Sequence, residues 1–483
     1  MKNSPSPLMH FLIISGGTFI NILIGVFTTP LITRMVEPSE YGKLSIFNLY
    51  ASIAVMIFCL GLDQAMVRFY YSYDSIAYKR KILKKVLVLP ILSWSIFATI
   101  FLIMYYKKIV AFEFGKAILI ILIFCVFIQI LSRISLLLLR LQYHSIGYSF
   151  ANIINKVCYV ILVILSIIVF KKNGLFILAL STTISSLITL CVSVLFERKI
   201  WFNKTKSINE NFNISNMELV KYGLPFILSM GITTVFQGID KISLNYFCSY
   251  KEIGIYSGAM SLVNIFAVLQ SSFNSIWAPM ATEHYEKNKN DVSFYQKGNA
   301  YITFLMFGMG ICLIFAKDLF ALFLGEKYRQ AAYVLPCLCF NPIMYTISET
   351  TVSGINFFKK SHLHIWSALF ACITNIIGNT ILVPNFGGRG AAISTGLSYI
   401  VFFAARTFFS NKYFYVDFKL YKLSILTIIV FLYAIYNTFV KFNFITVVFF
   451  IFCISVLLLL YKEELFGCFQ LLKKYIFKFI NKQ

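Results

Sequence analysis

Charged side chains occur inside long apolar runs of this sequence, where a charge is costly. Placing lysine, arginine or aspartate at the centre of a bilayer costs roughly 2.5–3.5 kcal/mol on insertion scales, so such residues are functional candidates by default. Eight lie within the runs or at their edges: Arg68, Arg133, Lys156, Lys241, Arg406, Asp63, Asp240 and Glu349. The five cations outnumber the three acids, which favours a cavity that accepts an anionic group.

Three of these cations, Arg133, Lys156 and Arg68, lie toward the same predicted side of the membrane. Coulomb attraction strengthens as the local dielectric constant falls, and arginine binds phosphate oxygens in a bidentate manner. We therefore expect these three side chains to bind a phosphorylated group. The alternative is that Asp63 neutralises Arg133 or Lys156 within a helix bundle, and that Arg68 extends its charged end to water.

The remaining acids and their neighbours are candidates for lining a cavity or for coupling transport to an ion. These are Asp63, Glu349, Asp240 and Lys241. Lys241 and Arg406 also lie close enough to the ends of their runs to reach water. No catalytic residue is predicted among the eight.

The elements that carry these residues are membrane-spanning helices. Of 483 residues, 59% are hydrophobic and 13% are charged, and the mean hydropathy is +0.79, whereas soluble proteins carry about 25% charged residues. A transmembrane barrel would show alternating polarity over about ten residues, but the runs at 118–129 and 425–436 are apolar on every face. We predict an all-α polytopic membrane protein with about fourteen spans of about 20 residues.

The predicted spans follow the apolar runs and the polar stretches between them. They cover residues 8–33, 42–67, 86–106, 117–139, 149–170, 174–196, 222–246, 253–281, 299–316, 331–357, 364–383, 389–409, 421–440 and 443–461.

The distribution of lysine and arginine predicts the orientation in the membrane. Both termini and the even-numbered loops hold about twice as many basic residues as the odd-numbered loops, and cytoplasmic loops keep the positive excess. Both termini are therefore predicted to be cytoplasmic. The clusters Lys79–Lys85, Arg198–Lys206 and Lys473–Lys474 are expected to contact anionic lipid headgroups, although they also serve as ordinary topology signals.

The chain contains a weak internal repeat. Residues 40–45, Glu-Tyr-Gly-Lys-Leu-Ser, resemble residues 252–257, Glu-Ile-Gly-Ile-Tyr-Ser, and Lys172-Asn173-Gly174 aligns with Gly388-Arg389-Gly390 at nearly the same separation. Matched loops at a constant spacing indicate two homologous bundles, here in parallel orientation. We predict a six-helix lobe at 1–200, a cytoplasmic inter-lobe loop at 201–217, a second six-helix lobe at 218–412, and two extra helices with a basic tail at 413–483.

Several function classes lack the residues that they need. The sequence contains no phosphate-binding loop and no H-E-x-x-H or G-x-S-x-G motif, and its eleven cysteines form no C-x-x-C pair, so no metal and no cofactor is predicted. The net charge of +24 belongs to loops that flank the membrane rather than to a soluble basic domain, and nucleic-acid binding is excluded.

Four stretches together resemble the bacterial polysaccharide repeat-unit flippases, the O-antigen and capsule exporters of the multidrug/oligosaccharidyl-lipid/polysaccharide superfamily. They are residues 29–42 with Thr-Pro-Leu-Ile-Thr-Arg and Pro-Ser-Glu-Tyr-Gly, residues 61–69, residues 240–279 from Asp-Lys to Trp-Ala-Pro, and residues 375–392 with Val-Pro-Asn-Phe-Gly. Their order and spacing extend over roughly residues 5–410.

The resemblance implies a V-shaped pair of six-helix lobes that gives alternating access to a central cavity. It also implies a substrate, a polyprenyl-diphosphate-linked oligosaccharide that moves from the cytoplasmic to the outer face of the bacterial inner membrane during O-antigen, capsule or lipopolysaccharide synthesis. Polysaccharide polymerase and chain-length proteins are candidate partners. The protein would be a transporter and not an enzyme.

Three alternatives share parts of this pattern. A multidrug or cation antiporter of the same superfamily would need an acid in the first lobe, where only Asp63 qualifies. A peptidoglycan-precursor or teichoic-acid-type flippase would share the architecture, but the first span carries Arg34 as its one basic residue. A membrane polysaccharide polymerase would need a large outer loop, and the outer loops are short.

Overall fold

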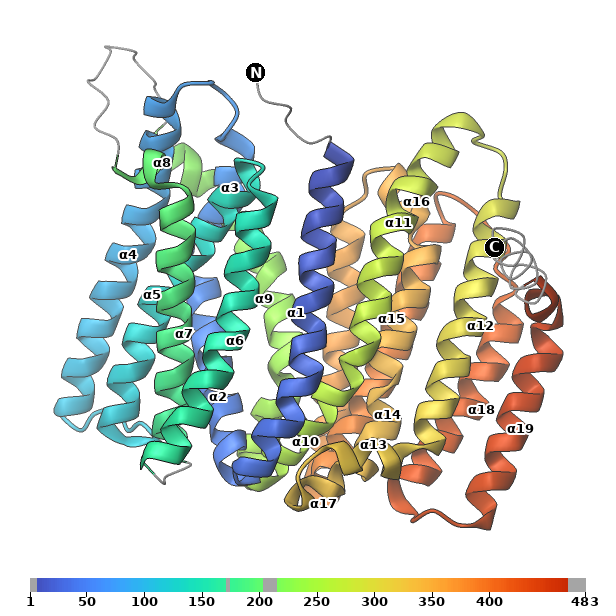
Figure 1. Ribbon diagram of the computed structural model, residues 1–483. Coiled ribbons are helices and arrows are strands. Elements are labelled where there is room, and N and C mark those ends of the chain that lie inside the picture. Colours follow the sequence, from blue (N-terminus) through green and yellow to red (C-terminus); the bar gives the residue numbers. More distant parts are fainter. Residues whose placement is uncertain (1–6, 171–173, 203–214, 468–483) are drawn as a thin grey trace, which may run out of the picture. The chain divides into compact units, whose positions relative to one another are not determined.

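The computed structural model describes residues 7–170, 174–202 and 215–467 (Figure 1). Within these ranges every regular element is a helix, because a helix satisfies its own backbone hydrogen bonds where no water is available. The predicted all-α fold is confirmed. Lys172 and Asn173 of the repeat, residues 203–214 of the predicted inter-lobe loop, and Lys473–Lys474 lie outside the described residues.

The chain divides into two compact units, Met1–Lys241 and Ile242–Gln483. The N-terminal unit contains α1 (Pro7–Met35), α2 (Pro38–Phe58), α3 (Leu62–Phe69), α4 (Ile76–Tyr106), α5 (Gly115–Leu141), α6 (Ser145–Phe170), α7 (Leu175–Phe196), α8 (Arg198–Phe202) and most of α9 (Asn216–Phe247).

In the N-terminal unit, α5 and α6 both pack against α7, α1 packs against α6, and α2 and α4 pack against α5. Figure 1 shows these long helices running alongside one another. Phe47, Leu62, Val126 and Leu178 are completely buried in the shared core. This packing places the inner faces of α2, α5, α6 and α7 around one region of the unit.

The C-terminal unit is built from more and shorter elements. They are α10 (Tyr250–Val263), α11 (Ile265–Lys287), α12 (Ser293–Phe315), α13 (Lys317–Phe323), the 3-10 helix η1 (Glu326–Tyr333), α14 (Leu335–Leu338), α15 (Phe340–Thr351), α16 (Ser353–Phe357), α17 (His362–Asn411), α18 (Leu420–Phe439) and α19 (Phe444–Leu460). Within this unit α15 packs against α12 and α17, and α19 packs against α12 and α18.

Helix α17 turns back on itself at Gly387. A straight helix of 50 residues would be about 75 Å long, more than twice the thickness of the hydrocarbon core. Gly387 instead adopts φ 55° and ψ −133°, a conformation that suits glycine. The Ser394 hydroxyl then donates to the carbonyl oxygen of Asn375 at 3.0 Å. The two halves are therefore antiparallel, as the predicted spans at 364–383 and 389–409 require.

Two further predicted spans are bent. The span at 253–281 is interrupted between α10 and α11 by a bend of 47°, and the span at 331–357 begins at a bend of 58° between η1 and α14. The described residues contain 10 helices that are long and apolar enough to cross a membrane, or 12 if each bent pair is one span. Both halves of α17 count as one helix in these numbers, and α19, with its 17 residues, is too short to be included. The number fourteen stays a prediction.

A carboxylate holds the start of a distant helix in each unit. In the first turn of α2, Glu40 Oε2 accepts a hydrogen bond at 2.5 Å from the backbone N–H of Leu175, where α7 begins. In the first turn of α10, Glu252 Oε2 accepts one at 3.1 Å from Gly388, where the second half of α17 begins. An anion at a helix N-terminus is stabilised by the unpaired N–H groups there. The two equivalent contacts agree with the internal repeat.

Two glycines allow α3 and α9 to touch through their backbones. Gly61 precedes α3 with φ 64°, and a Cβ built on it would overlap the carbonyl oxygen of Gly223 in α9. A Cβ on Gly223 would in turn lie 2.6 Å from the carbonyl oxygen of Leu60. This contact fixes the position of α3, which carries Asp63.

Replacing Gly61 by alanine is expected to destabilise the N-terminal unit by more than the cost of a positive φ for alanine. Gly115 provides the matched control, because it also has a positive φ, 79°, but has open space where a Cβ would stand. A left-handed conformation costs a non-glycine residue about 1–3 kcal/mol. Gly61→Ala adds a steric overlap to that cost and should lower the melting temperature in detergent well below that of Gly115→Ala. Equal melting temperatures would contradict the close contact.

Candidate functional site

A polar cavity of about 640 Å³ lies within the N-terminal unit, between α2, α5, α6, α7 and the middle of α9. Side-chain amides and hydroxyls make up most of its lining, together with one guanidinium: Gln129, Asn152, Asn155, Gln237, Ser52, Ser132, Ser186, Thr189, Thr233, Thr234 and Arg133. Several of these groups donate within the unit, as Asn155 Nδ2 does to Thr189 Oγ1 at 2.8 Å, and the acceptor sites that these bonds leave can accept hydrogen bonds from water or a polar ligand.

The sequence indicates this cavity through the spacing of uncharged polar residues within the apolar runs, which the charged residues alone do not reveal. On α5, Gln129, Ser132 and Arg133 are spaced at i, i+3 and i+4, and α6 carries Asn152 and Asn155 three residues apart. On α7, Thr182, Ser186 and Thr189 follow the same helical period, so that they share one face of the helix. A polar stripe of this kind on three consecutive spans predicts a shared polar cavity.

Arg133 lines this cavity and forms an ion pair with Asp63. Its Nε and Nη2 donate to Asp63 Oδ2 at 3.1 and 2.7 Å. The Asp63 side chain is 6% exposed and that of Arg133 is 40% exposed. Asp63 therefore lies in the packed interior and fixes one edge of the guanidinium, while the rest of that group faces the cavity. Arginine has five N–H donors, so donors remain for a ligand.

Lys156 lines a neighbouring cavity of about 300 Å³. Both cavities are lined by Gln129, Asn155 and Ser186, so the two cavities adjoin, and together they are called the polar region. Among the described residues no carboxylate forms an ion pair with Lys156.

The other predicted site residues of the N-terminal unit lie elsewhere. Arg68 is exposed in the last turn of α3 and is absent from the lining of both cavities. Asp240 is buried and Lys241 is half-buried in α9, and neither lines these cavities. The structure therefore brings together Arg133, Lys156 and Asp63 of the predicted set. Because Asp63 balances Arg133, the surplus positive charge of the polar region comes from Lys156.

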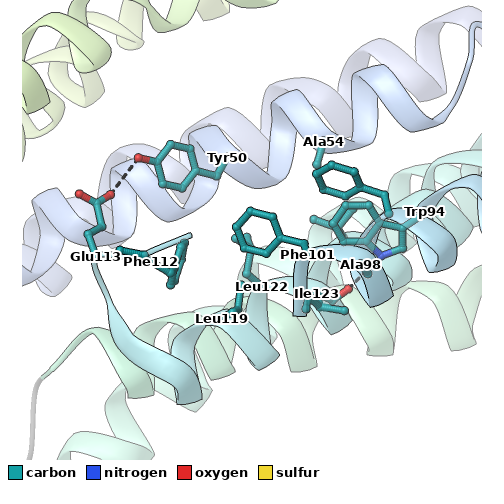
Figure 2. Close-up of a pocket in the computed structure, with 13 residues that line it drawn as sticks. Tyr50, Ala54, Trp94, Ala98, Phe101, Phe112, Glu113, Leu119, Leu122 and Ile123 are labelled. Carbon is teal, nitrogen blue, oxygen red and sulfur yellow. Dashed lines mark hydrogen bonds between the residues drawn. The ribbon is translucent and has the colours of Figure 1, made fainter. Parts of the chain in front are cut away.

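A second kind of hollow, an apolar groove of about 450 Å³, lies between α2, α4 and α5 of the same unit (Figure 2). Helix α2 turns Tyr50 and Ala54 toward the groove and Ser52 and Met56 toward the polar cavity. Helix α5 likewise lines both hollows. The two helices thus separate an apolar environment from a polar one.

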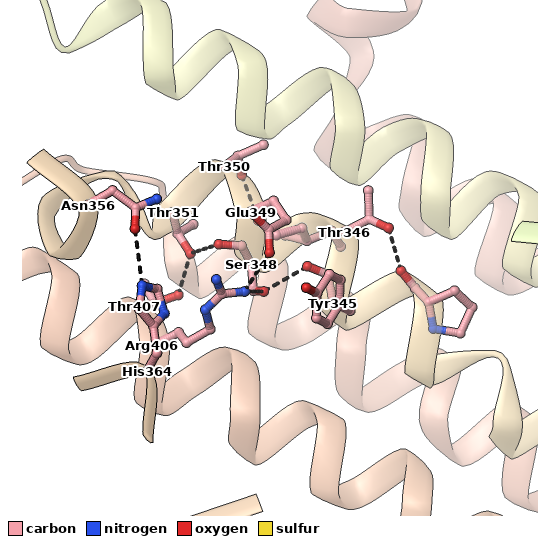
Figure 3. Close-up of polar contacts among 12 residues, drawn as sticks. Tyr345, Thr346, Ser348, Glu349, Thr350, Thr351, Asn356, His364, Arg406 and Thr407 are labelled. Atoms are coloured by element: carbon pink, nitrogen blue, oxygen red, sulfur yellow. Dashed lines mark hydrogen bonds and ion pairs between the residues drawn. The ribbon is translucent and has the colours of Figure 1, made fainter. Parts of the chain in front are cut away.

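In the C-terminal unit, the half-buried Glu349 and the buried Arg406 form an ion pair (Figure 3). Arg406 Nη1 donates to Glu349 Oε1 at 2.9 Å and to Ser348 Oγ at 2.6 Å. The guanidinium carbon also lies 5.1 Å from the centre of the Phe402 ring. Arg406, predicted to reach water at the end of its span, is instead 6% exposed. Its contacts join α15 to the second half of α17.

One buried cation was not predicted from the sequence. Lys317 is completely buried, and its ammonium donates to the carbonyl oxygens of Asn437 and Val440 at 2.5 and 2.7 Å. These carbonyls belong to the end of α18, where the last turn lacks intrahelical partners. Lys317 therefore stabilises the end of a helix. Lys317 directly follows the predicted span at 299–316, where a lysine is expected to reach water, so the sequence does not reveal its burial.

A histidine–carboxylate pair lies where α5, α6 and α7 end or begin, outside the spans. His144 Nδ1 lies 2.7 Å from Glu197 Oε1, and Glu197 follows the last residue of α7. Burial raises the pKa of the Glu197 carboxyl to about 7. The carboxyl of this pair therefore takes up and releases a proton near neutral pH.

The described residues contain no group of three or more His, Cys, Asp or Glu side chains that could hold a metal ion. The polar cavity thus offers hydrogen bonds and positive charge rather than a metal site. These are the groups that bind hydroxylated and phosphorylated molecules.

Comparison with known proteins agrees with this chemistry. Residues 8–285, more than half of the chain, match the family described as polysaccharide biosynthesis protein. The chain belongs to this family. The matched region contains residues 8–241 of the N-terminal unit, including the polar cavity. Membership in the family confirms the prediction of a transporter rather than an enzyme.

Two archaeal relatives are similar in sequence. An uncharacterised membrane protein of Methanocaldococcus jannaschii is 24% identical over 412 residues, which cover 79% of this chain and 80% of the relative. The probable low-salt glycan biosynthesis flippase Agl15 of Haloferax volcanii is 22% identical over 172 residues, or 34% of this chain and 36% of that protein.

The fold is also that of a solved transporter. The lipid II flippase MurJ in its inward closed conformation superimposes with a TM-score of 0.68, covering 95% of this chain and 99% of that protein at 17% sequence identity. At this identity the likeness concerns the fold alone. It confirms the predicted all-α polytopic fold.

The ion pair of the C-terminal unit is expected to contribute to stability. Glu349→Ala leaves a buried arginine without its partner, which costs about 3–5 kcal/mol, and should lower the melting temperature markedly. Asp63→Ala should cost less, because Arg133 is 40% exposed and water in the cavity can hydrate it. Glu283→Ala, in the exposed pair with Lys287, is the control. Equal melting temperatures of the three variants would contradict the burial of Arg406.

The Glu197 carboxyl is expected to make stability depend on pH. Its folded-state pKa of about 7 lies above the ordinary value of 4.5, so the folded state binds the proton more tightly. The resulting stability is present below pH 4.5 and is lost as the pH rises through 7, by at most about 3 kcal/mol. Glu197→Gln should flatten the melting temperature between pH 5 and 8, whereas the exposed Glu218→Gln should leave the wild-type slope. An unchanged slope in Glu197→Gln would refute the assignment.

Proposed function

We propose that this protein flips a polyprenyl-diphosphate-linked oligosaccharide repeat unit from the cytoplasmic to the outer face of the inner membrane. The single observation that carries the proposal is the polar cavity of the N-terminal unit, where amides and hydroxyls surround Arg133 and adjoin Lys156. Family membership in polysaccharide biosynthesis supports it, as does the similarity to a probable glycan biosynthesis flippase.

The lining matches both parts of such a headgroup. Sugars present many hydroxyls, each of which can donate and accept hydrogen bonds, and side-chain amides do both as well. The diphosphate requires cations: the free donors of Arg133 can bind its oxygens in pairs, and the ammonium of Lys156 supplies charge without a carboxylate beside it. We assign the sugar to the amide-rich wall and the diphosphate to these two side chains.

The ion pair with Asp63 prepares Arg133 for this role. A guanidinium that is held at one edge loses little side-chain freedom when its other edge binds a ligand, so binding costs less entropy. The pair is also neutral, which lowers the cost of keeping an arginine inside the bundle while the cavity is empty. In this proposal Asp63 is a positioning residue and does not touch the substrate.

Alternating access would move the headgroup while the lipid tail stays in the bilayer. The substrate begins in the cytoplasmic leaflet, so the predicted cytoplasmic termini and the basic loops describe the side on which it arrives. We propose an O-antigen, capsule or similar surface polysaccharide unit as the substrate, with the polymerase that consumes it and its chain-length proteins as partners. Arg68, Asp240 and Lys241 have no assigned role in binding.

The contacts of Asp63 bear on the alternative of a cation antiporter. Such a mechanism needs an acid in the first lobe that is free to exchange an ion. Asp63, the acid that the sequence predicts for that role, accepts two hydrogen bonds from Arg133 and is buried. This favours the lipid-linked substrate over a cationic drug.

Removing either cation from the polar region should reduce flipping. A hydrogen bond to a charged group contributes about 1.5–3 kcal/mol, so Arg133→Gln and Lys156→Gln are each expected to lower the flipping rate by roughly tenfold to a hundredfold. The measurement uses proteoliposomes that contain a polyprenyl-diphosphate oligosaccharide and reports how much of it an external enzyme can reach.

Arg140→Gln is the matched control, because Arg140 is exposed at the end of the same helix and lies outside both cavity linings. It should flip at the wild-type rate. Normal flipping by correctly inserted Arg133→Gln and Lys156→Gln would remove both residues from the proposed site. Flipping that is absent from the wild-type protein as well would refute the proposed function itself.

A further inference from the structure

The hydroxyl groups around the polar region donate their hydrogens to the backbone. A hydroxyl has a single hydrogen, and next to a carbonyl oxygen it must be the donor, because the carbonyl oxygen has no hydrogen. Five hydroxyls of the larger cavity each donate to a backbone carbonyl oxygen, at 2.8–3.1 Å: Ser52, Ser132, Ser186, Thr189 and Thr234. They therefore offer a ligand lone pairs rather than hydrogens.

The smaller cavity is built in the same way. The hydroxyls of Thr28 and Thr29 both donate to the carbonyl oxygen of Gly25, at 3.2 and 3.0 Å. Those of Thr182 and Ser185 donate to carbonyl oxygens of α7. These bonds lie within single helices, so they form without a ligand and must break before the hydroxyls can donate to one.

Two amide side chains of the polar region leave their oxygen atoms for a ligand. Asn152 Nδ2 donates to the carbonyl oxygen of Tyr148 at 2.9 Å, and Asn155 Nδ2 donates to Thr189 Oγ1 at 2.8 Å. Neither amide oxygen accepts a hydrogen bond from the described residues. Each amide keeps one N–H and the lone pairs of its oxygen, so the uncharged wall presents more acceptors than donors.

The cations of the polar region match the charge of the diphosphate and no more. Arg133 and Lys156 are charged, and no carboxylate of the described residues lines either cavity. Each phosphate of a diphosphate carries a negative charge, and Asp63 already balances Arg133. No positive charge is then left to attract a further anionic group.

We propose that the polar region selects lipid-linked oligosaccharides whose sugar next to the diphosphate is uncharged. A sugar hydroxyl or acetamido N–H donates to the lone pairs of the wall, whereas the carboxylate of an acidic sugar has only lone pairs of its own. Entry into the cavity would remove water from that carboxylate without replacing its hydrogen bonds. This inference rests on the proposed function and adds the chemical class of the sugar.

The test compares three substrates that differ only in the group at one carbon atom of the sugar. Proteoliposomes with the full-length wild-type protein contain polyprenyl-diphosphate glucose, glucuronic acid or glucuronamide, and an external pyrophosphatase cleaves the molecules that reach the outer face. Cleavage of each lipid in detergent corrects for any preference of the pyrophosphatase. Glucose and glucuronamide should be flipped at similar rates, and glucuronic acid at least about tenfold more slowly, because its charge is left without a partner.

The outcomes separate this inference from the proposed function. Equal flipping of glucose and glucuronic acid would overturn the inference and leave the proposed function standing. Flipping of glucuronamide as slowly as glucuronic acid would also overturn it, because the size of the substituent rather than its charge would then decide. Flipping of none of the three lipids would refute the proposed function, and this inference with it.

Gln237 offers a variant that tests the charge directly. It is exposed and lines the larger cavity from α9, so a lysine fits there without displacing packed side chains. Gln237→Lys should raise the flipping of glucuronic acid relative to glucose at least about threefold, as a partly solvated ion pair allows. Gln237→Met, of similar length but without charge, should keep the wild-type ratio whatever its absolute rate. A wild-type ratio in correctly inserted Gln237→Lys would contradict the proposal.

Discussion

The pair of Arg133 and Asp63 satisfies the constraint on which the N-terminal unit depends, that a charge inside a membrane protein needs a partner or water. Asp63 is the partner of Arg133 on the packed side, where the Asp63 side chain is 6% exposed. Water in the cavity can reach the arginine from the other side, because 40% of its side chain is exposed. The guanidinium thus stands at the boundary between core and cavity. The amides and hydroxyls of α5, α6 and α7 continue the polar surface of the cavity beyond the guanidinium.

Helices α2 and α5 keep two environments apart in one small bundle. Their polar faces line the cavity and their apolar faces line the groove, so each helix borders a polar environment on one side and an apolar environment on the other. The arrangement explains why such apolar helices carry isolated amides and hydroxyls, and why those residues repeat with the helical period.

The sequence was sufficient for the class of fold and for the family, because long apolar runs and ordered short motifs depend on local residues. Contacts between distant residues were beyond it. The sequence predicts Asp63 as a partner for either Arg133 or Lys156, and only packing decides in favour of Arg133, 70 residues away. The burial of Arg406 and Lys317 depends on neighbours from α15 and α18, which hydropathy does not reveal. No proline lies in α10, so the sequence does not predict the bend after Val263.

The backbone contact between Gly61 and Gly223 has a mechanical consequence. Gly61 lies two residues before Asp63, and Gly223 lies in the first turns of α9, the helix that leads from one unit into the other. With no side chain between them to absorb a displacement, any axial shift of α9 would push directly on α3. Movement of α9 would therefore displace Asp63 and change its ion pair with Arg133.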